Sequence, residues 1–135
     1  MKRILFVCCL LTAACTFTCH TQSYAQAAPA MPTVSKPDLI AKTAQLKTLL
    51  DAGDAVGGKA KWDEIHKILM SALSLTKYNI KSAVEAHNDV AKAHYTDVMI
   101  NQRNIYASLI QMRDNLVANK DAVNAKLTEF TATID

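Results

Sequence analysis

Two histidines in the second half of the sequence have a spacing that places them on about the same face of a helix. His87 and His94 are seven residues apart, and Asp97 follows His94 by three. On an α-helix His87 and His94 fall on about the same face, two turns apart, and His94 and Asp97 are close enough in the sequence to meet. Metal centres in helical bundles usually draw Glu and Glu-x-x-His ligands from several helices, and this sequence has no Glu-x-x-His. His87, His94 and Asp97 are therefore candidate ligands only, and a small-molecule or metal-binding bundle using His87 and His94 is the alternative to the main interpretation below.

Sequence patterns that carry catalysis give no support for an enzyme. There is no G-x-S-x-G nucleophile elbow, and no glycine-rich loop precedes a helix in a nucleotide-binding pattern. The only adjacent carboxylates, Asp63 and Glu64, fall where a helix is expected to begin, and the helix dipole accounts for acidic residues there. We therefore predict a protein without catalytic residues and without a cofactor.

Aromatic and cationic residues on one predicted helix are typical of a protein interface. Tyr95, Arg103 and Tyr106 fall within twelve residues, and Tyr and Arg are enriched where proteins meet. The expected partner is another protein or a second copy of this chain. The chain has 15 basic and 12 acidic side chains, a net charge of +3, which is too weak for a nucleic-acid partner.

The first 27 residues have the pattern of a secretory signal peptide. A basic start at Lys2 and Arg3 precedes an apolar run over 4–14, which is too short to span a bilayer as a helix. Ala25-Gln26-Ala27 supplies a small-x-small cleavage site. This pattern predicts an exported protein, periplasmic or secreted, whose mature chain begins at Ala28.

A second processing site competes with the first. Leu11-Thr12-Ala13-Ala14-Cys15 is a loose match to a bacterial lipobox, in which Cys15 would carry a lipid. Lipidation at Cys15 would make the protein a membrane-anchored lipoprotein, and only then is a membrane an expected partner. All four cysteines lie within residues 1–27, so cleavage after Ala27 leaves no cysteine for disulfides.

The remaining chain has the composition of a helical domain. All three prolines fall within residues 28–37, which we interpret as a Pro/Ala linker, and all three glycines fall within 53–58, which we interpret as a loop. From Lys59 to Asp135 there is neither Gly nor Pro, and strands joined by turns rarely run so long without either. We predict a helical bundle domain over residues 38–135.

An apolar stripe divides this domain into helices. From Leu69 to Ile134 the stripe recurs about every 3.6 residues, the helical period, with polar members at Thr76, His87, Gln102 and Lys120. Asn and Asp favour turns, so we expect breaks at 87–89 and 119–121. Helices are predicted over 38–52, 60–87, 89–118 and 121–134, with one continuous helix as the alternative for the last two.

The predicted fold is all-α: an antiparallel bundle of three or four helices, with an elongated coiled-coil-like hairpin or a continuous paired helix as variants. A fold-back near His87 places Leu73 and Ile80 against Ile105 and Leu109, and we expect all four to be buried. The sequence therefore predicts an exported, non-enzymatic helical module for protein interaction or assembly in the cell envelope or outside the cell.

Overall fold

The computed structural model describes residues 31–134, and throughout this range the regular structure is helical. Four α-helices and one short 3-10 helix follow one another: α1 Lys36–Asp51, α2 Ala55–Glu85, α3 Asp89–Met112, η1 Arg113–Asn115 and α4 Lys120–Ala132. The predicted all-α bundle is confirmed, in its four-helix form. The predicted signal peptide, its cleavage site and Cys15 lie outside the described residues.

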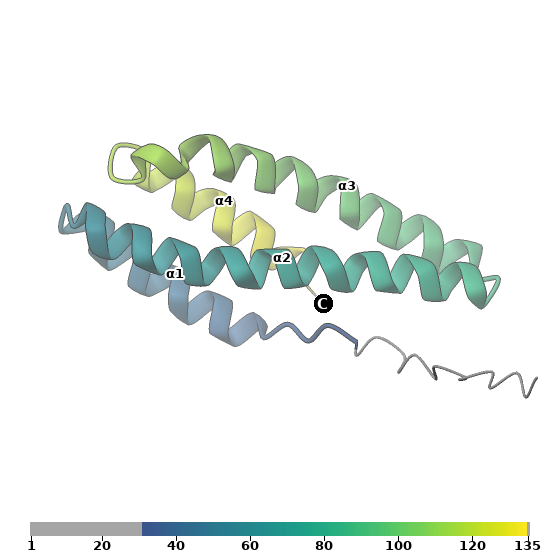
Figure 1. Ribbon diagram of the computed structural model, residues 1–135. Coiled ribbons are helices and arrows are strands. Elements are labelled where there is room, and N and C mark those ends of the chain that lie inside the picture. Colours follow the sequence, from purple (N-terminus) through teal and green to yellow (C-terminus); the bar gives the residue numbers. More distant parts are fainter. Residues whose placement is uncertain (1–30, 135) are drawn as a thin grey trace, which may run out of the picture.

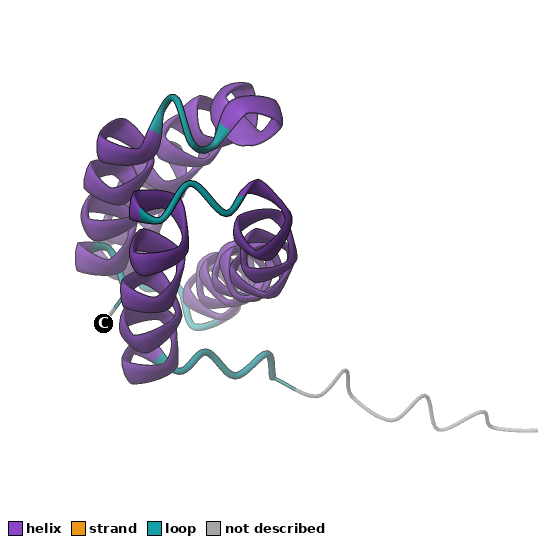
Figure 2. Cartoon of the chain, turned by 90° about the vertical axis from the view of Figure 1, so that its left-hand side faces the viewer, coloured by secondary structure: helices purple, strands orange, loops and turns teal. Residues whose placement is uncertain are grey.

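The helices form two layers of unequal length. The long helices α2 and α3 make an antiparallel hairpin, and the shorter helices α1 and α4 cover one of its sides (Figure 1). Figure 2 looks along the bundle from the end where the α1–α2 and η1–α4 connections lie together. Helix α1 packs on α2, and α4 packs on both α1 and α3, which closes a four-helix body.

Helix α1 begins and ends at residues whose chemistry suits those positions. The Ser35 side chain accepts a hydrogen bond of 3.2 Å from the backbone N–H of Asp38, as an N-cap does, and Pro37 lies in the first turn. Gly53 ends the helix with a φ of 73°. Its N–H donates to the carbonyl of Leu50, and the next N–H, of Asp54, donates to the carbonyl of Leu49, which is a Schellman motif.

The loop expected over residues 53–58 is shorter than predicted, because Gly57 and Gly58 lie inside α2. The Asp54 side chain caps the helix by accepting a hydrogen bond of 2.8 Å from the N–H of Gly57. A Cβ at Gly58 would lie 2.8 Å from Cδ2 of Leu50. The glycine therefore permits a close approach of α1 to α2, a packing reason that the composition did not reveal.

The predicted turn between the long helices is confirmed at residues 86–88. His87 adopts a φ of 53° and takes the position that Gly53 takes after α1. Its N–H donates to the carbonyl of Val84, and the N–H of Asn88 donates to that of Ala83, which completes a second Schellman motif. Asn88 then caps α3, because its side-chain Oδ1 accepts a hydrogen bond of 3.0 Å from the backbone N–H of Ala91.

Helix α3 is shorter than predicted, and it is not continuous with the last helix. It ends at Met112 rather than at 118, and the chain turns through η1 before α4 begins at Lys120. The Asn119 side chain donates a hydrogen bond of 2.8 Å to the carbonyl of Asn115 within this turn. The reversal lets the apolar stripe of α4 face the other helices, since Val123, Leu127 and Phe130 are fully buried.

The apolar stripe is buried in the body and emerges from it along the hairpin. Leu69, Ile105 and Leu109 belong to the central core, as predicted. Leu73 and Ile80 are only half-buried, which corrects the expectation that they are core residues. At Ile80, on the arm, the reason is that α1 and α4 do not extend far enough to cover this part of the hairpin (Figure 1). Leu73 lies within the body, where it packs against the core cluster but stays partly exposed.

The segment interpreted as a linker is partly packed. Val34 contacts the core cluster. The Lys36 ammonium donates a hydrogen bond to the backbone carbonyl of Ile134, which is 98 residues later in the sequence. Helix α1 also begins two residues earlier than predicted. The chain from Val34 onward is therefore part of the bundle.

Candidate functional site

The structure separates His87 from the other two candidate metal ligands. His87 lies in the turn rather than on α3, so the helical spacing that related it to His94 does not apply. His94 and Asp97 are exposed on α3, and the His94 ring meets the Tyr95 ring edge-on with centroids 5.1 Å apart. Within residues 31–134 no group of three or more His, Cys, Asp or Glu side chains is placed to hold a metal ion.

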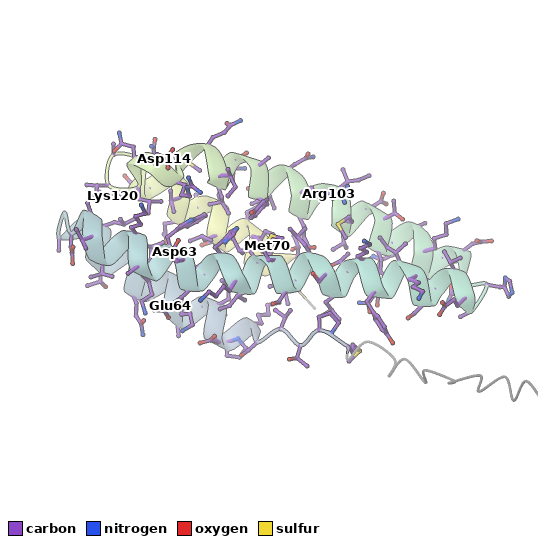
Figure 3. The ribbon with its side chains drawn as sticks, viewed as in Figure 1. Asp63, Glu64, Met70, Arg103, Asp114 and Lys120 are labelled. Atoms are coloured by element: carbon purple, nitrogen blue, oxygen red, sulfur yellow. The ribbon has the colours of Figure 1, made fainter. Side chains whose placement is uncertain are left out.

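The three candidate interface residues lie at different places along α3. Arg103 is exposed (Figure 3). Tyr106 is half-buried, and its hydroxyl lies 2.6 Å from Nε2 of His66 on α2. Tyr95 is about 16 Å further along the helix, at 1.5 Å per residue. The structure therefore brings Arg103 and Tyr106 near one another and leaves Tyr95 in a separate region.

Tyr95 lies in a groove at the point where the four-helix body ends. The groove has a volume of about 160 Å³, and its lining includes Leu75 and Asn79 of α2 and Tyr95 and Val98 of α3. Thr133 and Ile134, which follow α4, line it on one side. The groove exists because α4 stops while α2 and α3 continue.

The part of the hairpin that continues past this groove is the feature that we single out as a candidate site. We call residues 77–101 the arm: the end of α2, the turn at His87 and the beginning of α3 (Figure 1). Only Ala83 and Met99 are buried apolar residues within it. Four of the eight large apolar side chains that are exposed in the described chain lie on the arm: Tyr78, Val84, Val90 and Ile100.

A layer of hydrogen-bonded polar side chains marks the base of the arm. Gln102 is 2% exposed, and its Oε1 accepts a hydrogen bond of 2.9 Å from the hydroxyl of Thr76. Its Nε2 donates to the hydroxyl of Thr133, which follows α4, at 3.1 Å. The layer joins α2, α3 and the end of α4, so the arm begins beyond the point where three segments are fixed together.

Ion pairs hold the helices of the body together. Glu64 of α2 receives hydrogen bonds from Lys42 of α1 at 2.8 Å and from Lys61 at 2.9 Å, and these two ammonium groups lower the pKa of Glu64 to about 2 (Figure 3). Asp51 of α1 pairs with Lys120 of α4 at 2.9 Å and with Lys47, and its pKa is lowered as well, chiefly by Lys47. All these groups are partly exposed, so we interpret the ion pairs as contacts that orient the helices and not as a catalytic site.

A second groove, of about 600 Å³, lies at the opposite end of the molecule from the arm. Its lining includes Ala55, Lys59 and Asp63 from the start of α2 and Asp114 and Val117 from the η1 connection. Its charges are of both signs, and it is open to solvent. Nothing in this groove selects one class of ligand.

Comparisons with known proteins identify no relative whose function could be compared with this chain. No family model, no curated protein and no solved structure matches the chain. Among the helices of residues 31–134, none has the length and apolar character that crossing a bilayer requires.

The arm is what sequence reasoning missed. The apolar stripe runs without interruption through body and arm, so the stripe alone does not reveal which part is covered. The signal that could have found the arm is the difference in helix length: α2 has 31 residues and α3 has 24, whereas α1 has 16 and α4 has 13.

Proposed function

We propose that the protein is an exported, non-enzymatic helical module that binds protein through its arm. The observation that carries this proposal is the projection of two paired helices beyond the body, with Tyr78, Val84, Val90 and Ile100 exposed on them. Exposed apolar residues that are concentrated in one projecting segment favour an interaction surface, whereas isolated ones are ordinary.

The residue types on the arm and at its base agree with this proposal. Tyr95 lines a groove beside apolar Leu75 and Val98, and a tyrosine offers both an apolar ring and a hydrogen-bonding hydroxyl to a partner. An exposed Arg103 follows at the base of the arm. Arg and Tyr are among the residues that most often dominate binding energy at protein interfaces.

The proposed export depends on the signal pattern of residues 1–27 and on the absence of cysteine from residues 28–135. A domain without disulfides relies on its core, and the core here is continuous through all four helices. Intact mass spectrometry of the protein recovered from cells tests the export. A mass that begins at Ala28 supports a soluble exported protein, a mass with an acylated Cys15 supports the lipoprotein form, and an unprocessed Met1 in the cytoplasm would contradict both.

Site-specific photo-cross-linking in living cells tests the binding role. A benzophenone amino acid is placed at Val90 of the arm or, as the control, at Val56 of the body. These two valines are closely matched: each is the second residue of a long helix that an Asp or Asn side chain caps, and they are 82% and 83% exposed. We expect protein adducts from position 90 and not from position 56. Adducts from position 56 alone, or from neither position, would contradict the proposal.

A further inference from the structure

The α2–α3 hairpin has a second side, which α1 and α4 do not cover within residues 31–134 (Figure 1). On α2, the edge of this side is a stripe with a helical spacing of three and four residues: His66, Met70, Leu73, Lys77, Ile80 and Val84. On α3, a stripe with the same spacing lies opposite: Lys92, Thr96, Met99, Arg103 and Tyr106. The hydrogen bond of 2.6 Å between His66 and Tyr106 shows that the two stripes meet. We call the surface of these two stripes the seam.

The seam and the short helices lie on different sides of the hairpin. On α2, Glu64 pairs with Lys42 of α1, and Met70 of the seam lies about 120° from Glu64 around the helix axis. On α3, Gln102 donates to the segment that follows α4, and Arg103 of the seam lies about 100° further around. Met70 and Arg103 are both on the side of the hairpin that is turned toward the viewer in Figure 3, and α1 and α4 lie behind it. No other helix of the described chain therefore packs on the seam.

The centre of the seam is apolar but incompletely buried. Met70 and Val84 are 44% and 49% exposed, and Leu73 and Ile80 between them are half-buried. From His66 to Val84 the seam follows α2 for about 27 Å, at 1.5 Å per residue. A line between two antiparallel helices accepts a third helix, whose side chains pack between those of both. The seam therefore offers a packing surface for a helix of about five turns.

Two cations of the seam have no carboxylate partner in the described chain. Lys77 of α2 and Arg103 of α3 are exposed, and neither makes an ion pair within residues 31–134. Lys92 lies near the tip of the arm, where Asp89 and Asp97 line the same shallow pocket. The excess of positive charge on the seam is therefore at Lys77 and Arg103, one on each helix.

We infer that the seam binds an acidic amphipathic helix of a partner protein. This inference rests on the proposed binding role of the arm and names the kind of partner. The apolar side of such a helix covers Leu73 and Ile80, and carboxylates along its two edges pair with Lys77 and Arg103. An anionic lipid surface would meet the same two cations. A helix fits better, because it can enter the line between α2 and α3, whereas a flat surface touches only the outermost side chains.

Photo-cross-linking from two neighbouring positions tests where the partner lies. Ile100 is 54% exposed and belongs to the side of α3 that carries the seam, three residues before Arg103. Asn101 is also exposed but lies about 100° further around the helix, away from the seam. With a benzophenone amino acid in living cells, we expect at least about ten times more adduct from position 100 than from position 101. Mass spectrometry of the cross-linked fragment should identify an acidic segment with apolar residues at helical spacing. A fragment without an excess of Asp and Glu, or a lipid adduct, would overturn the acidic helix.

Charge reversal tests the role of the two cations. Lys77→Glu combined with Arg103→Glu should lower the yield of adduct from position 100 at least about tenfold, because like charges then face one another. Lys59→Glu combined with Lys67→Glu is the control with the same change in net charge. Lys59 lies in the groove at the opposite end of the molecule and Lys67 near the start of α1, so this variant should keep the wild-type yield. Circular dichroism verifies that both variants are folded. Equal losses in the two variants would overturn recognition through the seam.

Failure of this inference can be told apart from failure of the proposed function. Protein adducts from position 90, with none from position 100, overturn the seam as the binding surface and leave the binding role of the arm intact. Equal adducts from positions 100 and 101, together with adducts from position 90, do the same. The absence of protein adducts from positions 90 and 100 overturns both.

Discussion

The hydroxyl of Thr76 donates a hydrogen bond of 2.9 Å to Oε1 of Gln102 inside the α2–α3 interface. The same hydroxyl lies 3.1 Å from the carbonyl of Ala72, and Gln102 also donates to Thr133. The pair is buried at the level where α4 ends. It therefore fixes the relative position of three segments at the boundary between body and arm.

Substitution of the two partners should have unequal effects. Thr76→Val leaves the buried Oε1 of Gln102 without a donor, and we expect the free energy of unfolding to fall by about 1–3 kcal/mol. Gln102→Leu should cost less, because the Thr76 hydroxyl keeps Ala72 and the Thr133 hydroxyl keeps the carbonyl of Phe130. Urea unfolding, followed by the fluorescence of the single Trp62, measures both. Equal losses of unfolding free energy in the two variants would show that Oε1 of Gln102 does not depend on the Thr76 hydroxyl for its hydrogen bond.

Truncation of stripe residues should distinguish body from arm. Leu109→Ala removes a fully buried side chain from the core and should cost about 2–5 kcal/mol. Val84 belongs to the same apolar stripe but is half exposed on the arm, so Val84→Ala should cost about 1 kcal/mol or less. Thermal unfolding of the two variants gives the comparison. Similar losses at both positions would mean that the arm is covered in the monomer.

The turn at His87 should be improved by glycine. A left-handed backbone costs an L-residue about 1–2 kcal/mol, and a glycine at position 87 would avoid this cost. Part of the stability gained in this way is offset by the greater conformational freedom of glycine in the unfolded chain. We therefore expect His87→Gly to raise the free energy of unfolding by about 0.5–1 kcal/mol. Gly53→Ala, which places a Cβ in the equivalent position after α1, should lower it by about 1 kcal/mol. Destabilisation by His87→Gly would assign the histidine side chain a contact role.

Stability should fall in acid through the carboxylates that join helices. The pKa of Glu64 is lowered in the folded protein from 4.5 to about 2, so its contribution is complete above pH 4.5 and is lost as the pH falls toward about 2. Asp51 acts in the same direction. Glu64→Gln should remove part of this pH dependence, measured by urea unfolding at several pH values. Glu129→Gln is the control, because its partner Lys126 lies on its own helix. An unchanged pH dependence in Glu64→Gln would contradict the role of this ion pair.

The helices could be predicted because local chemistry determines their ends. Ser35 and Gly53 act as the cap and the stop that their residue types indicate, and Asn88 ends the turn between the long helices. Gly58 was misassigned to a loop because its role depends on the close approach of Leu50, in another helix. A contact of this kind is not encoded in the local sequence.

The candidate site could not be predicted in the same way. Thr76 and Gln102 are recognisable as polar members of an apolar stripe, but their pairing requires the register of the hairpin. Ile80 has the spacing of a core residue, yet its burial depends on where α1 and α4 end. The arm is a property of the relative lengths of four helices after packing, and no single segment of the sequence contains it.

Shortening the arm tests the central claim most directly. Deletion of residues 77–83 together with 95–101 removes two turns from each long helix, keeps the helical phase and retains the turn at His87 and the layer at Gln102. Whole-cell cross-linking, followed by the apparent mass of the protein, compares this variant with the wild type, after circular dichroism and thermal unfolding have shown that the body is folded. The account predicts higher-mass adducts for the wild type and monomer alone for the shortened protein. Identical adducts from a folded shortened protein would contradict the assignment of binding to the arm.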